Sequence, residues 1–324
     1  MNDFRAYLRR LRRRVPPTVG GAAVNVGRLT AILLSRDTLH MRDLGELHET
    51  HLLTRRAAVD RANELVARYS GVARQYGQWE ELSSREARVQ SQNGEDGILL
   101  HLLSSMTVSP VHRALEIGSG GWSSNIANLV LHFGFDGVFV DASTVQLADQ
   151  RRRLAALAPD ALTRAMFVEA WVRPASFATD ARSWAGPEMD VLSVDIDSVD
   201  YWLFAGLDEP LARIVVAEYN ASFGPTARLT VPMDEAFDRW SAHPSGYYYG
   251  ASLAALDHAL SPKGYALVGT ESSGVNAFFV RDDVLPEGLV RVPPSDAYHP
   301  DARRRHVPQA EQEALLKSLG PVEV

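Results

Sequence analysis

The sequence predicts an α/β protein whose core is a mostly parallel β-sheet. Short apolar runs that end in glycine or acidic residues alternate with segments of helical period, as parallel strands and their connecting helices do. The clearest unit is the stretch 114–143, which has the pattern of a strand, a glycine-rich turn, a helix and a second strand. Two later apolar runs, 265–268 and 277–280, are joined by so short a connection that they must pair antiparallel.

The same patterns place the other elements in order along the chain. A polar stretch, 88–97, leads into a helix before the first strand, and a long irregular insertion, 222–249, follows the fifth strand. The predicted strands are 114–117, 137–140, 165–168, 191–194, 212–220, 265–268 and 277–280, and the predicted helices are 98–103, 126–133, 145–157, one bearing 202–204, 250–260 and 309–319.

Composition divides the chain into three parts. Residues 1–80 form a helical N-terminal extension, 81–285 an α/β domain, and 286–324 a C-terminal tail with a short helix. The extension opens with a strongly basic segment, 1–16, whose apolar residues fall on one helical face. That segment is either a solvated helix or a peripheral contact with a membrane surface, an acidic substrate or a partner subunit. We expect the extension to mediate homo-oligomerisation or to cover the active site.

Charge and composition argue against several classes of protein. A net charge of −7 at pH 7 disfavours nucleic-acid binding through bulk charge. The absence of cysteine excludes disulfides, thiolate metal sites and cysteine nucleophiles. No apolar run approaches the ~20 residues that cross a bilayer, and the basic N-terminus lacks the apolar core of a signal peptide. We therefore expect a cytoplasmic protein.

The glycine-rich turn after the first strand has the features of a nucleotide-binding site. Gly118 and Gly120 allow a tight turn and a close approach of the backbone to a ligand. Asp141 lies 21 residues beyond Gly120 (141 − 120), near the ~20 expected of an acid that binds ribose hydroxyls. Glu116 precedes the first glycine, where a carboxylate suits the ammonium group of an amino-acid moiety better than a pyrophosphate.

This pattern, E-x-G-x-G followed by an aspartate after the next strand, resembles motifs I and II of class I S-adenosylmethionine-dependent methyltransferases. Residues 88–283 carry the resemblance, which includes V-D-I-D at 194–197, E-Y-N at 218–220 and the final hairpin. S-Q-N-G-E-D-G at 91–97 is similar to the entry segment of FkbM-type carbohydrate enzymes, although the lysine and the acid-glycine-acid pattern of those enzymes are replaced here by S-V-D-I-D-S-V-D. Acidic residues after the fourth and fifth strands resemble macrocin-type sugar O-methyltransferases, which depend on magnesium.

The resemblance implies a Rossmann-like class I methyltransferase fold, a seven-stranded sheet with a C-terminal antiparallel hairpin, and S-adenosyl-L-methionine as the cofactor. Gln92 and Asn93 then reach over its methionine end, or Asn93 caps the following helix instead. Trp171 either stacks on the adenine or packs. The implied cofactor-binding residues are Gln92, Asn93, Glu116, Gly118, Ser119, Gly120, Asp141, Ala142, Ala170, Trp171 and Asp195.

Acidic residues end the first, second, fourth and fifth strands, so their carboxylates should crowd one edge of the sheet. Such a group needs a positive or hydrogen-bonding partner. One interpretation is a Mg²⁺ site whose oxygen ligands come from Asp195, Asp197, Glu218 and Asn220. The other has Asp195 contacting the cofactor or acting as the catalytic base, with Asp197 and Asp200 capping the next helix.

The insertion carries the candidate acceptor site. Tyr247, Tyr248 and Tyr249 suit a sugar or polyol pocket, because they offer both aromatic faces and hydroxyls. His243 is a candidate base because the pKa of histidine suits neutral conditions, or else it is a surface histidine. We expect O-methylation of a sugar or other hydroxylated small molecule. The alternatives are a catalytically inactive nucleotide-binding or assembly module and an NAD-linked oxidoreductase, which Glu116 and the final hairpin disfavour.

Overall fold

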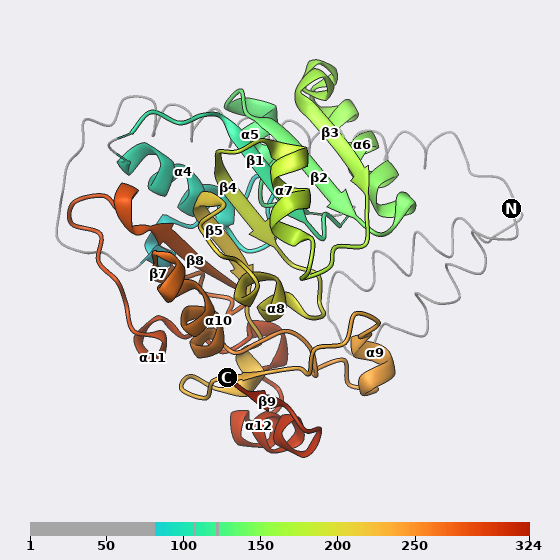
Figure 1. Cartoon of the computed structure of the whole chain (residues 1–324), viewed down its shortest axis with the longest axis vertical. Coiled ribbons are helices and arrows are strands. Elements are labelled where there is room, and N and C mark those ends of the chain that lie inside the picture. The colour runs from blue at the N-terminus through green and yellow to red at the C-terminus, as the bar shows by residue number, and fades with distance from the viewer. Residues whose placement is uncertain (1–81, 107, 121–122) are drawn as a thin grey trace, which may run out of the picture. The chain divides into compact units, whose positions relative to one another are not determined.

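The computed structural model describes residues 82–106, 108–120 and 123–324 (Figure 1). These residues belong to the compact unit Ala58–Val324. The predictions about the extension 1–80, including its basic segment, oligomerisation and peripheral contact, fall outside the described residues. Within those residues, no helix is both long and apolar enough to span a bilayer.

A seven-stranded sheet forms the centre, with the strand order β3-β2-β1-β4-β5-β8-β7. The first five strands are parallel, and β8 runs antiparallel to both of its neighbours, β5 and β7. The predicted α/β fold, Rossmann-like and of the class I methyltransferase type with a C-terminal antiparallel hairpin, is confirmed. The strands are β1 (Arg113–Ile117), β2 (Asp136–Asp141), β3 (Ala165–Glu169), β4 (Met189–Val194), β5 (Ala212–Glu218), β7 (Tyr265–Thr270) and β8 (Asn276–Arg281).

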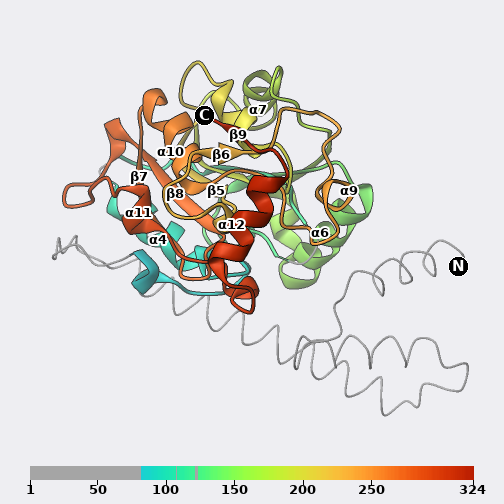
Figure 2. The same cartoon turned by 90° about the horizontal axis from the view of Figure 1, so that it is seen from below.

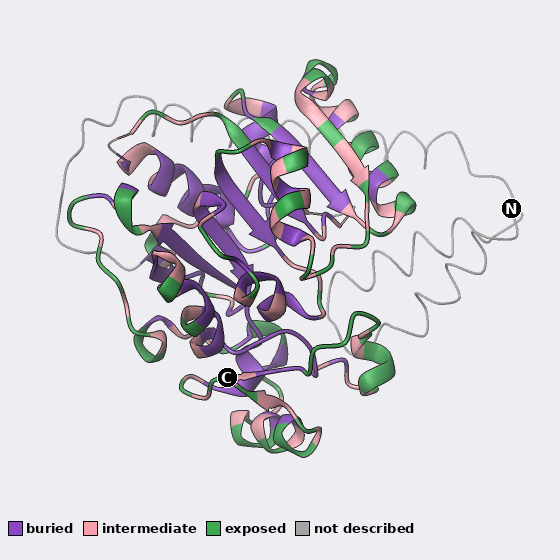
Figure 3. Ribbon diagram, in the orientation of Figure 1, coloured by how far each residue is buried: buried purple, intermediate pink, exposed green. Residues whose placement is uncertain are grey.

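Helices cover both faces of the sheet, which buries its central strands (Figures 1 and 3). Side chains alternate along β1: Leu115 and Ile117 join the core under one set of helices, and Ala114 joins the core under the other. The two sets appear on opposite sides of the sheet when it is seen from below (Figure 2). The first set is α7 (Phe177–Ala185), α8 (Asp200–Ala205) and α10 (Leu253–Leu260), and the second is α4 (Glu95–Ser105), α5 (Ala127–His132) and α6 (Thr144–Leu157).

The insertion and the C-terminal tail pack together beside the sheet. Two-residue strands, β6 (Leu229–Thr230) from the insertion and β9 (Val322–Glu323) from the tail, pair antiparallel. The insertion also carries α9 (Arg239–Ala242), and the tail carries α11 (Pro294–Ala297) and α12 (Gln309–Ser318). Residues far apart in sequence therefore meet on the side of the sheet where α12, β6 and β9 lie (Figure 2).

The polar stretch before α4 is organised by a buried carboxylate. Asp96 Oδ2 accepts hydrogen bonds from the backbone N–H groups of Val89, Gln90 and Ser91, at 2.8, 2.7 and 2.8 Å. Burial raises the pKa of Asp96 to about 6, although these bonds oppose the shift. Asn93 does not cap α4: the capping position is Gly94, which has a φ of 108° and makes no side-chain cap bond.

Asp96→Ala should destabilise the protein by roughly 3 kcal/mol or more, because it leaves three backbone donors without an acceptor. Asp96→Asn keeps an acceptor oxygen and should cost less. Denaturant unfolding of the two variants checks this order, and equal midpoints for Asp96→Ala and the wild type would contradict it.

Candidate active site

The carboxyl ends of four parallel strands meet at one edge of the sheet (Figure 1). Each brings the acid that the sequence placed there: Glu116 near the end of β1, Asp141 ending β2, Asp195 just after β4 and Glu218 ending β5. The neighbouring strands hold these ends in register, so the edge is built by the sheet.

The glycine-rich turn packs directly against the end of β4. Gly118 has a φ of +82°, and a Cβ there would stand 1.6 Å from the carbonyl oxygen of Asp195. Only glycine allows this approach. The N–H groups of Gly118 and Ser119 both donate to the carbonyl of Val140, at 2.9 and 3.0 Å, which ties the turn to β2. Among the residues that the structure describes, none lies within 4 Å of where a Cβ of Gly120 would stand, so the described part of the turn borders open space there.

Glu116 fixes the other side of this turn. Its carboxylate accepts from Ser124 Oγ at 2.5 Å and from the N–H of Asn125 at 2.6 Å, where α5 is about to begin. Burial raises the pKa of Glu116 to about 7, despite these hydrogen bonds. The sequence suggested that this carboxylate faces an ammonium group. In the structure each of its oxygens accepts one hydrogen bond from the segment that leads into α5.

Asp141 lies half-buried at the end of β2. Its Oδ1 accepts from the N–H of Ser143 at 2.7 Å, and its backbone carbonyl accepts from the N–H of Ala170 at 3.1 Å. Burial raises the pKa of Asp141.

Among the other residues predicted to bind the cofactor, Ala142 is exposed, as is Gln92. Asn93, in contrast, is buried, and its N–H and Nδ2 donate to the Glu95 carboxylate at 2.7 and 3.1 Å.

Trp171 follows β3 and is 55% exposed. Its Nε1 donates to the carbonyl of Glu235 in the insertion, at 3.1 Å. An ion pair between Arg173 and Glu235, 3.0 Å long, joins the same two segments. Trp171 therefore holds the insertion near the end of β3.

Three carboxylates form a compact group at the ends of β4 and β5. Asp195, Asp197 and Glu218 each place one oxygen within 4.8 Å of the other two. Burial, followed by the charge of Asp197, raises the pKa of Asp195 to about 7. Burial and the charge of Asp195 raise the pKa of Glu218 well above its usual range. Asp197 has a φ of 55° and pairs with Arg239 of α9.

Asp200 and Asn220 point elsewhere. The carboxylate of Asp200 accepts from the N–H groups of Ile196 and Ser198, at 2.9 and 3.1 Å, and so orders the loop before α8. Asn220 Nδ2 donates to the carbonyls of Tyr247 and Tyr249, at 2.7 and 2.8 Å. Its Oδ1 accepts from Nη1 of Arg304, a residue of the C-terminal tail, at 3.0 Å. Asn220 fastens the insertion and is absent from the carboxylate group.

The three tyrosines of the insertion differ in burial and in their partners. Tyr249 is buried and donates its hydroxyl to Glu218 Oε1 at 3.1 Å. Tyr248 is buried against Phe237, with ring centroids 6.0 Å apart. The ring of Tyr247 lies against the guanidinium of Arg304 in the tail. His243 is half-buried, and its Nδ1 lies 2.8 Å from Ser245 Oγ within its own loop.

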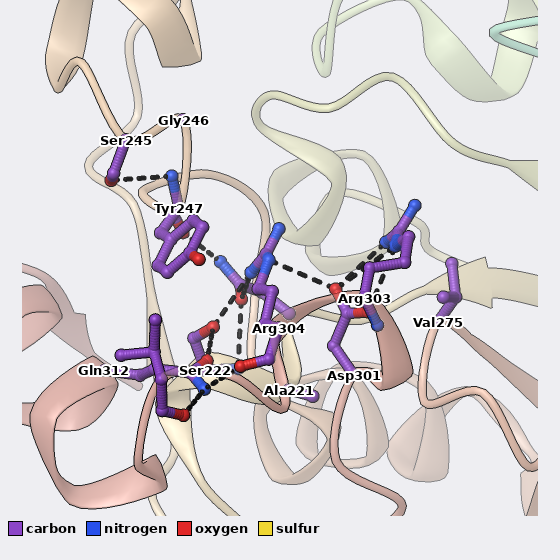
Figure 4. A network of polar contacts seen from close by, with 12 residues as sticks. Ala221, Ser222, Ser245, Gly246, Tyr247, Val275, Asp301, Arg303, Arg304 and Gln312 are labelled. Atoms are coloured by element: carbon purple, nitrogen blue, oxygen red, sulfur yellow. Dashed lines mark hydrogen bonds and ion pairs between the residues drawn. The ribbon is translucent and has the colours of Figure 1, made fainter. Parts of the chain in front are cut away.

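The sequence did not locate the cations at this edge. Besides Arg239 of the insertion, they come from the tail, where Arg304 Nη1 donates to Asn220 Oδ1 and Ser222 Oγ, at 3.0 and 2.8 Å (Figure 4). Its Nη2 donates to Tyr249 Oη at 3.1 Å, and its guanidinium carbon lies 4.5 Å from the ring centre of Tyr247. The basic run 303–305 was visible in the sequence, but its position beside β5 was not.

Glu116→Gln should change how stability depends on pH. The folded-state pKa of about 7 exceeds the ordinary glutamate value of 4.5, so the wild type loses stability as pH rises between these values. The amide carries no charge and should escape that loss, which is on the order of 3 kcal/mol. Unfolding midpoints of both proteins from pH 5 to pH 8 test this, and parallel pH profiles would contradict it.

No family model matches the chain, and no curated protein matches it. Solved structures similar to it include the glycopeptide N-methyltransferase MtfA complexed with sinefungin, at 15% identity over 61% of this chain and 98% of that one, with a TM-score of 0.36. The N-terminal domain of EvdMO1 with SAH bound is 14% identical over 56% of this chain and 75% of that one, with a TM-score of 0.35. A Methanococcus jannaschii fibrillarin pre-rRNA processing protein is 11% identical over 59% of this chain and 76% of that one, with a TM-score of 0.34. At these scores none of them assigns an activity to this chain.

Proposed function

We propose that the chain is an S-adenosylmethionine-dependent methyltransferase that methylates a hydroxyl of a sugar or other hydroxylated small molecule. The observation that carries this proposal is the arrangement at one sheet edge: the Gly118–Gly120 turn, Asp141 on one side of it and the carboxylate group on the other. Ligands of open parallel sheets bind at such an edge.

The residues present fit the cofactor. The Ser143 N–H donates to Asp141 Oδ1 and orients the carboxylate. Oδ2 of the same carboxylate is then suited to accept from the ribose hydroxyls. Gly120 borders open space, so the turn can admit a ligand close to its backbone. The bound cofactor would supply a methyl group on a sulfonium. The protein then has to align the acceptor and take its proton.

Without a bound metal, Asp195 is our choice for the group that takes the proton. Its backbone contacts the glycine-rich turn at Gly118, and its carboxylate lies beside Glu218, so it links the cofactor side to the acceptor side. The hydrogen bonds of His243 stay within its own loop, which makes it the weaker candidate. A sugar hydroxyl is a poor nucleophile at neutral pH and needs such a base or a metal.

A divalent cation such as Mg²⁺ is the second element of the proposal. Asp195, Asp197 and Glu218 would hold it, because hard cations prefer carboxylate oxygens and these three approach one another closely. A bound cation would acidify an acceptor hydroxyl. Asp197 also pairs with Arg239, so this arginine competes with a metal for the same carboxylate.

Asp141→Ala should weaken S-adenosylhomocysteine binding about tenfold to a hundredfold, since a charge-assisted contact contributes roughly 1.5–3 kcal/mol. Asp136→Ala is the matched control, because Asp136 is an exposed residue at the opposite end of the same strand. Calorimetric titration measures both. Equal affinities for the two variants would rule out the role of Asp141, and tighter binding of NAD would favour an oxidoreductase.

Methyl transfer should be lost on chelation and restored by Mg²⁺ or Mn²⁺. Glu218→Gln should sharply reduce turnover and leave cofactor affinity almost unchanged, because the missing charge lies on the acceptor side. A radiolabelled methyl-transfer screen across nucleotide sugars, glycans and polyols supplies the assay. Full activity after exhaustive chelation would eliminate the metal and leave Asp195 as the base.

A further inference from the structure

Two tail arginines share one buried carboxylate beside the acidic edge. The side chain of Asp301 is 3% exposed. It accepts from the Arg303 N–H, Nε and Nη2, at 2.8, 3.0 and 3.1 Å, and forms an ion pair with Arg304 Nε at 3.1 Å (Figure 4). One carboxylate cannot neutralise two guanidinium groups, so the trio Asp301, Arg303 and Arg304 carries one surplus positive charge.

The two arginines differ in what remains available to a ligand. Arg304 is 6% exposed, and its donors are used by Asp301, Asn220, Ser222 and Tyr249. The side chain of Arg303 is 47% exposed. Within the described part of the chain, the hydrogen bonds of its side chain go only to Asp301 and leave Nη1 unused. The surplus charge is therefore presented by Arg303.

Arg303 also lies within electrostatic reach of the proposed acceptor site. Burial lowers the pKa of Arg303, but its hydrogen bonds with Asp301 and the negative charges of Asp301 and Glu218 raise it, and the net shift is upward. In turn, the charge of Arg303 lowers the pKa of Asp195. The contacts make the same connection: Asp301, which holds Arg303, pairs with Arg304 at 3.1 Å, and Arg304 donates to Tyr249, whose hydroxyl donates to Glu218. The guanidinium of Arg303 is therefore tied by these contacts to the carboxylates that we assign to the acceptor side.

We infer that the methyl acceptor carries an oxyanion, a phosphate or a carboxylate, and that Arg303 binds it while the group to be methylated lies at Asp195 and Glu218. This inference rests on the proposed methyl-transfer function. Asp301 already holds the guanidinium, so little side-chain entropy remains to be lost on binding. A planar guanidinium is the side chain best matched to two oxygens of one oxyanion.

The test is calorimetric titration of the full chain loaded with S-adenosylhomocysteine. The probes are glucose 6-phosphate, glucuronate and inorganic phosphate, with glucose as the neutral reference. The wild type should bind at least one anionic probe about tenfold or more tightly than glucose. Arg303→Gln should bring that ratio to within about twofold, and Arg303→Lys should give an intermediate ratio, because it keeps the charge and loses the planar contact.

Arg305→Gln is the matched control. Arg305 is also exposed and lies two residues after Arg303, so the substitution removes the same charge from a neighbouring position. It should keep the preference of the wild type. The inference is overturned if the wild type does not distinguish anionic from neutral probes, if Arg303→Gln keeps the preference, or if Arg305→Gln loses it equally. Affinity for S-adenosylhomocysteine is measured in every variant: its absence in the wild type would overturn the proposed function itself, whereas normal affinity without an anion preference overturns only the role of Arg303.

Discussion

The burial of carboxylates at one sheet edge is the constraint on which the rest of the structure depends. Parallel topology brings the ends of β4 and β5 together, and with them Asp195 and Glu218. Charges removed from water at such close range are costly unless protons, donors or counter-charges compensate them. Burial and the neighbouring charges raise the pKa of both groups, so both favour the protonated form more than a free carboxyl does.

Much of the chain outside the sheet supplies that compensation. The insertion brings Tyr249 to Glu218 and Arg239 to Asp197. The tail brings Arg304, which holds Tyr249 and Asn220 at once. Asn220 in turn binds two carbonyls of the insertion. An ion pair and two hydrogen bonds therefore lead from Asp301 through Arg304 and Tyr249 to Glu218, and they join three segments that are distant in sequence.

The sequence predicted what depends on local pattern and topology, and it failed where the partners are distant. The sheet, its hairpin and the four acids at strand ends followed from apolar runs and from the rule that parallel strands end at one edge. No helix was predicted at α7, a nine-residue helix that buries Phe177, Ala181 and Ala185 and packs Trp184 against the same core. Asn220 looked like a metal ligand because it follows Glu218, but no sequence pattern shows that its amide is committed to Arg304 and the insertion. The tail arginines had no local signal beyond their charge.

The late position of Asp301, Arg303 and Arg304 has a consequence for the order in which the protein can fold during synthesis. The sheet requires the chain only as far as β8, which ends at Arg281. A nascent chain of that length contains Glu218 and Tyr249 but not the guanidinium that holds Tyr249. Until the tail is made, the acidic edge lacks the positive charges of Arg303 and Arg304. The strands of the sheet are therefore synthesised first, and the arginines that complete the electrostatics of the site are synthesised after them.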